Sequence, residues 1–501
     1  MPLVGRASRP LSPSGSSADA HPDHERAIFG DYQTPDALAV AVVDLLVAAG
    51  LAPATIVEPT CGRGAFLHAA VRAFPGATRV VGVERDRAHA AAARRRVEDA
   101  RTSGQAVDVR VGDFFDVAWS SEAAALPGPV LVLGNPPWVT TGGLGVHDAA
   151  ALAPRSNFKR HAGIEAMTGR GHFDVAELML IRLLEGFRNR ETTLAVLVKS
   201  SVARRVLAYA WTSDLPLDDA ALYDIDVPRW FGASATGALL RLRMRADASR
   251  VRECPVRALD DPAAPPAHVF GLRGGVLVGD AWAYDAVSRF VRRDGNVGAP
   301  RWRSGVKHDC AAVMELEARD GLLWNGLGER VDVEPDCVFP LVKASDLGAE
   351  RVPRFVVLPQ TRTADDTATL ESRLPKTWAY LCRHAARLDA RRSRIYRGRP
   401  RFAVFGVGPY TFAPWKVAIS ALHKTPRFVV LGPRQGRPVV VGDTTNHLSF
   451  DTEAEARDAV ARLSSEDGRA VLAALMFPDA KRPVTIEMLQ RIDLGALARL
   501  A

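Results

Sequence analysis

One short stretch, Leu131-Val132-Leu133-Gly134-Asn135-Pro136-Pro137-Trp138, constrains the fold of this 501-residue chain more than any other. Its apolar run predicts a buried β-strand over residues 129–134. The two prolines end that strand, because proline has no N–H to donate to a neighbouring strand. The strand therefore presents an amide, rigid carbonyls and a flat aromatic ring at one edge of a sheet. Those groups suit a planar base that carries an exocyclic amine.

Strands and helices alternate through the first 250 residues. Short apolar runs predict strands at 55–58, 79–84, 107–111, 192–199, 221–225 and 238–244, in addition to the strand at 129–134. Helical spacing predicts helices at 37–49, 66–74, 88–100 and 173–187, the first of them with Thr34 as its N-cap and Pro35 at its first position. This alternation is typical of an α/β fold with a doubly wound parallel sheet.

Three further predicted strands end in groups that can bind a ligand. The first ends at Glu58 and leads into a turn that contains Gly62 and Gly64, where the backbone can approach a ligand at a helix N-terminus. The second ends at Glu84, and an acid at this place commonly binds ribose hydroxyls. The third is followed by Asp113 and Phe114, which suit the amine and the ring face of an adenine. All lie at the carboxyl edge of the sheet, where open α/β sheets bind ligands.

The second half of the chain has a different pattern. Pro262, Pro265 and Pro266 predict a linker, and the strands after it are short and irregularly spaced. We therefore expect a separate α+β domain at 251–501, after a first domain at 26–250. Residues 1–25 are rich in Ser, Pro and Ala, and they predict a disordered tail without the apolar segment of a signal peptide.

Basic residues concentrate in one part of the second half. The whole chain has a net charge of +8, but the 55 residues from Arg383 to Arg437 hold 13 Lys and Arg and one acid, Asp389. Aromatic residues alternate with these cations, which favours binding to a polyanion with stackable bases. A solvated basic surface over core aromatics is the alternative. The candidate nucleic-acid contacts are Arg391, Arg392, Arg394 and Lys416.

Cysteine usage and hydropathy limit the remaining classes. Five scattered cysteines with no Cys-x-x-Cys pair favour a reducing cytoplasm and argue against structural zinc, so we expect no metal. No apolar run is long enough to span a bilayer. A cytoplasmic protein is the expectation.

The order of these motifs resembles that of the gamma-class adenine-N6 DNA methyltransferases. The matching segments, between about residues 29 and 245, are 29–35, 58–66, Glu84, 112–114 and 135–138. Residues 302–310 and 410–420 resemble, more loosely, the target-recognition domains attached to this class. One departure is Gln33, where the family often has Phe or Glu. The resemblance implies a Rossmann-like class I methyltransferase sheet, S-adenosylmethionine as cofactor, and double-stranded DNA as partner, with any restriction endonuclease on a separate chain.

The resemblance also implies roles for individual residues. The methionine part of the cofactor would be held by Thr34, Glu58, Pro59, Cys61, Gly62, Gly64 and Phe66, the ribose by Glu84, and the adenine by Asp113 and Phe114. The catalytic motif would be Asn135, Pro136, Pro137 and Trp138. Oxygens of Asn135 and Pro136 can accept both hydrogens of the target amine and direct its lone pair at the methyl group, which is catalysis by positioning and electrostatics. Trp138 would stack on the flipped base, and Phe231 would be either a second wall of that pocket or a core residue.

Several alternatives stay open at this point. N4-cytosine methylation uses the same acceptors, and protein glutamine-N5 methylation also uses Asn-Pro-Pro-aromatic sites. A catalytically inactive DNA-binding module is the non-enzyme alternative. Carbon-5 cytosine methylation is disfavoured because the chain has no Pro-Cys. We interpret residues 307–310 as a loop or DNA-facing segment rather than as a metal site, and residues 156–171 as a mobile loop over the active site.

Overall fold

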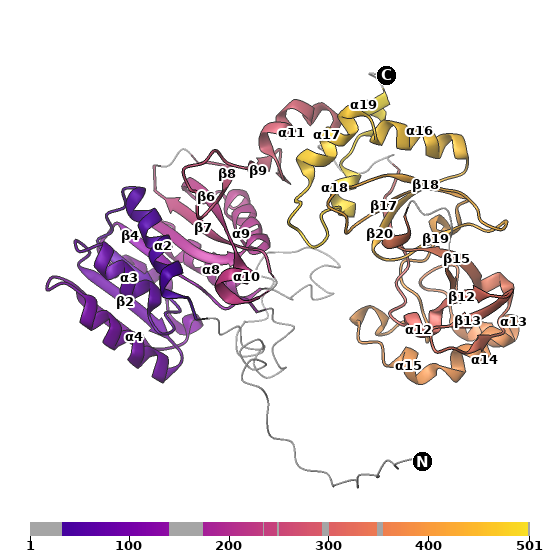
Figure 1. Ribbon diagram of the computed structural model, residues 1–501, viewed down its shortest axis with the longest axis horizontal. Helices are drawn as coiled ribbons and strands as arrows, with labels where there is room; N and C mark the ends of the chain where they lie inside the picture. The colour runs from indigo at the N-terminus through magenta and orange to yellow at the C-terminus, as the bar shows by residue number, and fades with distance from the viewer. Residues whose placement is uncertain are drawn as a thin grey trace, which may run out of the picture. The chain divides into compact units, whose positions relative to one another are not determined.

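The computed structural model describes residues 33–139, 174–233, 235–247, 250–292, 300–347 and 354–498 (Figure 1). The predicted tail at 1–25 and the predicted loop at 156–171 lie outside these residues. The chain divides into two compact units. The first runs up to Val251 and includes Arg257–Ala264, and the second contains Arg252–Val256 and everything from Pro265 onward.

The first unit is built on seven neighbouring strands of a ten-stranded sheet, in the order β6-β7-β5-β4-β1-β2-β3. Neighbouring strands are parallel, as predicted, among β5, β4, β1, β2 and β3. Strand β7 is antiparallel to both of its neighbours, β5 and β6. The reason is the connection between β6 and β7, which is too short for the crossover that a parallel pair needs. The strands are β1 Thr55–Glu58, β2 Arg79–Glu84, β3 Ala106–Val111, β4 Val130–Gly134, β5 Thr192–Lys199, β6 Leu217–Ile225 and β7 Gly237–Met244.

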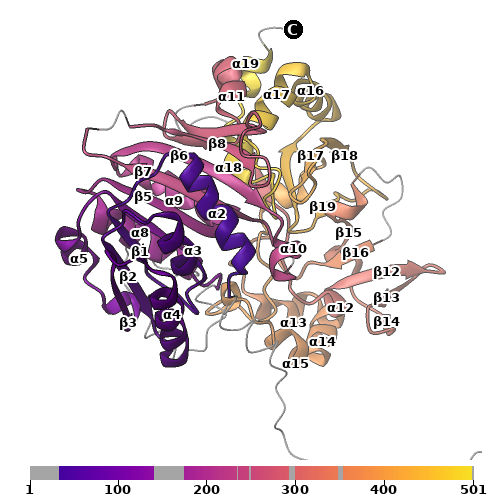
Figure 2. The ribbon, with the colours of Figure 1, turned by 60° about the vertical axis from the view of Figure 1, so that its left-hand side comes forward.

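Helices cover both faces of this sheet (Figure 2). On one face α2 (Asp36–Ala48), α3 (Ala65–Ala73) and α4 (Arg87–Ala100) pack against one another. On the other face lie α5 (Trp119–Ala125), α8 (Val175–Phe187) and α9 (Ser200–Thr212), and α10 (Val227–Phe231) connects β6 to β7. The prediction of an α/β fold with a largely parallel central sheet is confirmed.

The second unit is mixed α+β. β8 (Glu253–Ala258), which begins in this unit and ends in the first, forms an antiparallel pair with β9 (His268–Arg273), so the three prolines predicted to be a linker lie in the connection between them. β10 (Val276–Val278) extends that pair. A four-stranded sheet of order β11-β20-β17-β18 follows, with strands Arg303–Ser304, Thr445–Phe450, Trp415–Ser420 and Val429–Leu431. Its core is shared with α11 Ala281–Val287, α16 Glu453–Leu463, α17 Glu466–Leu475, α18 Ile486–Gln490 and α19 Leu494–Ala498.

A six-stranded sheet completes the second unit, in the order β14-β13-β12-β16-β15-β19. Its strands are Arg330–Val331, Leu322–Asn325, Glu315–Arg319, Arg354–Val357, Val338–Val342 and Val440–Val441. The short helices α12 Ala311–Met314, α13 Leu370–Arg373, α14 Pro375–Arg383 and α15 Ala385–Asp389 lie in the same part of the unit (Figure 1). In the part of the chain that the structure describes, no helix combines the length and the apolar character of a membrane span.

Candidate active site

The turn between β1 and α3 is shaped by two glycines with left-handed backbone. Gly62 has φ 49° and Gly64 has φ 80°. A Cβ on Gly64 would lie 2.9 Å from both Cα and Cβ of Ala93, so any side chain there would collide with α4. The main-chain N–H of Gly62 donates to Oε2 of Glu84 at 2.8 Å, and the N–H of Asp86 donates to Oε1 of the same carboxylate. The acid at the end of β2 is therefore fixed against the glycine turn.

Gln33, the residue that departs from the family pattern, contacts the same turn. Its Oε1 accepts a hydrogen bond from the main-chain N–H of Arg63 at 3.1 Å. A Cβ on Gly62 would lie 2.7 Å from that oxygen. Thr34 follows and is half-buried, but α2 begins at Asp36, so the N-cap position belongs to Pro35 rather than to Thr34 as predicted.

Glu58 is buried at the end of β1. Its Oε2 accepts a hydrogen bond from the N–H of Leu67 in the first turns of α3 at 3.1 Å. Burial raises the pKa of the Glu58 carboxyl well above its usual range, and the nearby carboxylate of Glu84 adds to the effect. The carboxyl therefore holds its proton to higher pH than an exposed glutamate does.

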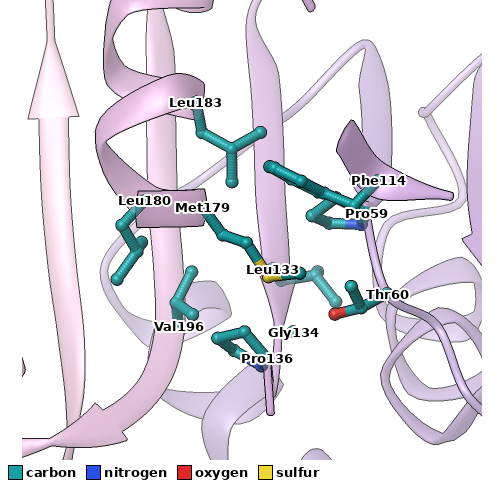
Figure 3. Close-up of a pocket in the computed structure, with 10 residues that line it drawn as sticks. All are labelled: Pro59, Thr60, Phe114, Leu133, Gly134, Pro136, Met179, Leu180, Leu183 and Val196. Carbon is teal, nitrogen blue, oxygen red and sulfur yellow. The ribbon is translucent and has the colours of Figure 1, made fainter. Parts of the chain in front are cut away.

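An apolar pocket lies at the carboxyl ends of the central strands (Figure 3). Phe114 and Pro59 form one side of it, and Met179 and Leu183 of α8 face them. Asp113 directly precedes Phe114, and its Oδ1 accepts a hydrogen bond from the N–H of Phe115 at 2.8 Å. The other lining residues are Thr60, Leu133, Gly134, Pro136, Leu180 and Val196.

The catalytic motif predicted after β4 lies beside this pocket. Pro136 lines the pocket directly, and the Trp138 indole Nε1–H donates to the carbonyl of Leu197 at 3.2 Å. The Trp138 ring covers Gly237, where a Cβ would lie 2.4 Å from Cη2 of the indole. The ring of Phe231 lies 6.0 Å from that of Trp138, at an interplanar angle of 51°. Phe231 thus comes next to the motif in space, although 93 residues separate the two aromatics along the chain.

A lysine at the end of β5 ties the motif to helix α8. Nζ of Lys199 donates to the main-chain carbonyl of Trp138 and to Oδ2 of Asp174, both at 2.8 Å. The Asp174 side chain is 4% exposed, and its Oδ1 caps α8 by accepting the N–H of Ala176. The motif, β5 and the start of α8 are thereby held together by one ammonium group.

Two predicted cofactor residues lie in the core rather than at the pocket surface. Phe66 is fully buried on α3, and Cys61 is 3% exposed. Burial raises the pKa of the Cys61 thiol, and the carboxyl groups of Glu58 and Glu84 raise it further. Both side chains therefore belong to the hydrophobic core next to the turn.

The four basic residues predicted to contact nucleic acid occupy different environments. Arg392 is exposed, and nothing is described of the side chain of Arg394. Arg391 is half-buried and donates to the main-chain carbonyls of Leu388 and Ala403. Lys416 is 1% exposed, with Nζ 2.6 Å from the carbonyl of Ala413, and burial lowers its pKa to about 8. The prediction of a DNA contact gains no support from the placement of Lys416.

Sequence reasoning missed several residues of the site. The pocket residues of α8 belong to a helix that was predicted at 173–187, and Met179, Leu180 and Leu183 have the spacing of one helix face. That spacing predicts that the three side chains share one face of the helix, but it does not predict that this face lines a pocket. Lys199 and Gly237 carried no signal, because their partners at Trp138 are 61 and 99 residues away.

Two known proteins resemble this chain along most of its length. The type II methyltransferase M.NspV of a Nostoc species is 36% identical over 475 residues, which are 94% of this chain and 97% of that protein. The solved structure of the type IIL restriction-modification enzyme MmeI in complex with DNA matches 94% of this chain with a TM-score of 0.54. Its identity is 12% and the match covers 66% of its own chain, so it shows a shared fold only. No family model matches the sequence.

Proposed function

The chain belongs to the type II methyltransferases, the DNA methyltransferases of restriction-modification systems, and from this premise we propose that it methylates the N6 amine of adenine in a specific duplex sequence. The cofactor of this class is S-adenosylmethionine. The observation that carries the proposal is the position of Asn135-Pro136-Pro137-Trp138: it follows β4 directly, at the carboxyl edge of the sheet, and Pro136 lines the apolar pocket.

The described residues fit that cofactor. The left-handed Gly62 and Gly64 keep side chains out of the turn at the start of α3. Glu84 is fixed at the end of β2, where its carboxylate oxygens can accept hydrogens from ribose hydroxyls. Phe114 lines the apolar pocket, and Asp113 directly precedes it in the chain. When bound, S-adenosylmethionine supplies an electrophilic methyl group on a sulfonium.

The proposed chemistry of this chain is positioning. An adenine amine is a poor nucleophile because its lone pair is delocalised into the ring. The side-chain oxygen of Asn135 and the main-chain carbonyl of Pro136 would accept its two hydrogens and hold the lone pair toward the methyl donor. Two acceptors arranged before the substrate arrives lower the barrier without a strong base.

Trp138 and Phe231 are proposed to hold the target base outside the duplex. Their rings lie close together beside the motif, and the indole is fixed by its hydrogen bond to Leu197 and by the space above Gly237. A base that leaves the stack loses pairing and stacking energy, and a preformed aromatic wall offsets part of that loss. This assigns Phe231 to the base pocket rather than to the core alone.

Residues 26–250 are proposed as the catalytic domain and residues 251–501 as the target-recognition domain. Exposed cations of the second, among them Arg392, would neutralise phosphates. A cognate restriction endonuclease would be a separate chain.

The test is a methyl-transfer assay with the full chain, labelled S-adenosylmethionine and mixed-sequence DNA, followed by digestion to nucleosides and mass spectrometry. N6-methyladenine that disappears with Asn135→Ala supports the proposal. Label on cytosine N4 or on protein glutamine would assign the chain to one of those alternatives. Absence of any transfer by a folded chain that binds cofactor would support the inactive DNA-binding module.

A further inference from the structure

Phe405 in the second unit is an exposed aromatic residue on a fixed backbone. Its side chain is 41% exposed. Its main chain pairs with that of Lys307 in an isolated antiparallel bridge, with both N–H···O distances at 2.9 Å. Its neighbours Val404 and Phe402 are buried. Phe405 therefore offers a partly exposed aromatic side chain on a backbone that the bridge to Lys307 holds in place.

The backbone is left-handed on both sides of Phe405. Phe402 has φ 66°, which is a rare conformation for a bulky residue, and Gly406 has φ 78°. A Cβ on Gly406 would lie 3.0 Å from the carbonyl oxygen of Gly305. On the segment opposite, Asp309 has φ 51°. The strain at Phe402 is of the kind that concentrates at functional sites, where the surrounding structure holds it.

Arg391 and Tyr396 hold the two segments together. The Tyr396 hydroxyl donates to the carbonyl of Lys307 at 3.0 Å. Nη1 of Arg391 donates to the carbonyls of Ala403 and His308, at 2.7 and 3.3 Å, and its guanidinium lies 3.9 Å from the ring centre of Tyr396. The helix that precedes Arg391, α15, lies close to α12 in both views (Figures 1 and 2). Arg391 therefore acts as a support for this surface.

The groups presented next to Phe405 are polar and charged. Lys307 Nζ lies 3.6 Å from Oδ1 of Asp309, and both side chains are about one-third exposed. Arg397 and Arg399 are exposed in the turn after Tyr396, which is closed by a hydrogen bond from the Arg399 N–H to the Tyr396 carbonyl. A 3.6 Å ion pair between partly exposed side chains is weak, and both groups can exchange this partner for a ligand.

We propose that Phe405, Lys307 and Asp309 form a base-reading platform that contacts base edges of the recognition sequence in duplex DNA, flanked by Arg397 and Arg399 on phosphates. This inference rests on the proposed function and names the residues that give it sequence specificity. A Phe ring suits a thymine methyl, a lysine suits guanine O6 and N7, and an aspartate suits the cytosine amine. The excess of exposed cations matches the charge of DNA, and a rigid platform loses little freedom on binding.

The experiment compares full-length wild type with Phe405→Ala. The recognition sequence is first determined by methylation-sensitive sequencing of DNA from cells that express the chain. Fluorescence anisotropy then measures binding to a duplex with that sequence and to a scrambled duplex. Leu422→Ala is the matched control, because Leu422 is 40% exposed in the same unit but lies outside the platform. Thermal unfolding checks that each variant is folded.

The platform predicts that Phe405→Ala loses about tenfold or more in affinity for the specific duplex and keeps its affinity for the scrambled one. The double variant Arg397→Gln/Arg399→Gln should weaken both and reduce the slope of log affinity against log salt by about two. Equal losses of Phe405→Ala on both duplexes, or no loss beyond that of Leu422→Ala, overturn the proposal. If wild type methylates no DNA, the proposed function fails instead.

Discussion

Replacing Lys199 with Met should destabilise the first unit and also impair the proposed catalytic motif. The change leaves the Asp174 carboxylate, which is 4% exposed, without its ion-pair partner, and removes a hydrogen bond from the carbonyl of Trp138. Removal of one partner from a buried pair costs about 3–5 kcal/mol. Because the Lys199 side chain is 27% exposed, the lower end, about 3 kcal/mol, applies. At about 2–4 °C per kcal/mol for a unit of this size, the unfolding midpoint should fall by about 6–12 °C.

A double-mutant cycle with Asp174→Asn isolates the pair. Asparagine keeps an oxygen to cap α8 at Ala176 but carries no charge. Scanning calorimetry should therefore find Lys199→Met/Asp174→Asn more stable than Lys199→Met alone, by about 2 kcal/mol. Steady-state methylation should show a lower kcat for Lys199→Met with little change in the KM for the cofactor. The reason is that the Lys199 ammonium contacts the main chain of Trp138 and not the glycine turn proposed to bind the cofactor.

Arg205→Met is the matched control. Arg205 forms an ion pair of similar length, 2.6 Å, with the buried carboxylate of Glu177 on the same helix as the Asp174 cap. It has no described contact with the motif, so its variant should lose stability but keep the kcat of wild type. The reasoning is refuted if the double variant is as unstable as the sum of the single ones, or if Arg205→Met lowers kcat as much as Lys199→Met.

Three other outcomes are expected. Asn135→Ala should lower methyl transfer by about 100-fold or more, with cofactor affinity unchanged in calorimetry; a transfer rate near that of wild type would exclude Asn135 as the acceptor. Gly237→Ala should lower the free energy of unfolding by about 1–3 kcal/mol and slow methyl transfer, because the new Cβ would lie 2.4 Å from the Trp138 indole. Urea unfolding measures the first effect and a methyl-transfer assay measures the second. Burial lowers the pKa of His447 in the folded chain from its usual 6.5 to about 3. Between these two pH values the unfolded chain binds a proton at His447 that the folded chain does not. The free energy of unfolding should therefore rise with pH in this range. The slope of urea-derived stability against pH should be shallower in His447→Gln, and an equal slope would contradict this.

Local patterns predicted the elements that position the site. β1, β2 and β5 have the predicted bounds, because each is an apolar run bounded by turn or polar residues. α9 was missed, since Ser200 follows β5 directly with neither Pro nor Gly between them. The antiparallel direction of β7 was also missed, because strand direction depends on the length of a connection in space and not on the strand's own residues.

Side-chain environments were harder to predict than elements. Arg391 and Lys416 were selected for their charge and for the basic residues around them. In the fold, Arg391 binds main-chain carbonyls, and the register of β17 places Lys416 opposite Ser449 and Leu431, with its side chain buried. Those partners come from other segments of the chain, so the sequence around Arg391 or Lys416 does not predict these contacts.

The register of the parallel strands has a consequence for how this chain can change in length. β1 pairs with β4 through Ile56 and Leu131, and β4 pairs with β5 through Leu133 and Ala195. Deletion of one residue within β4 would turn its side chains to the opposite faces and move Pro136 away from the pocket. Insertions in the connections at the amino ends of the parallel strands, on the edge opposite the pocket, leave that alignment unchanged. Length variation among natural homologues should therefore collect in those connections, and chimeras should exchange whole strand–helix units rather than parts of strands.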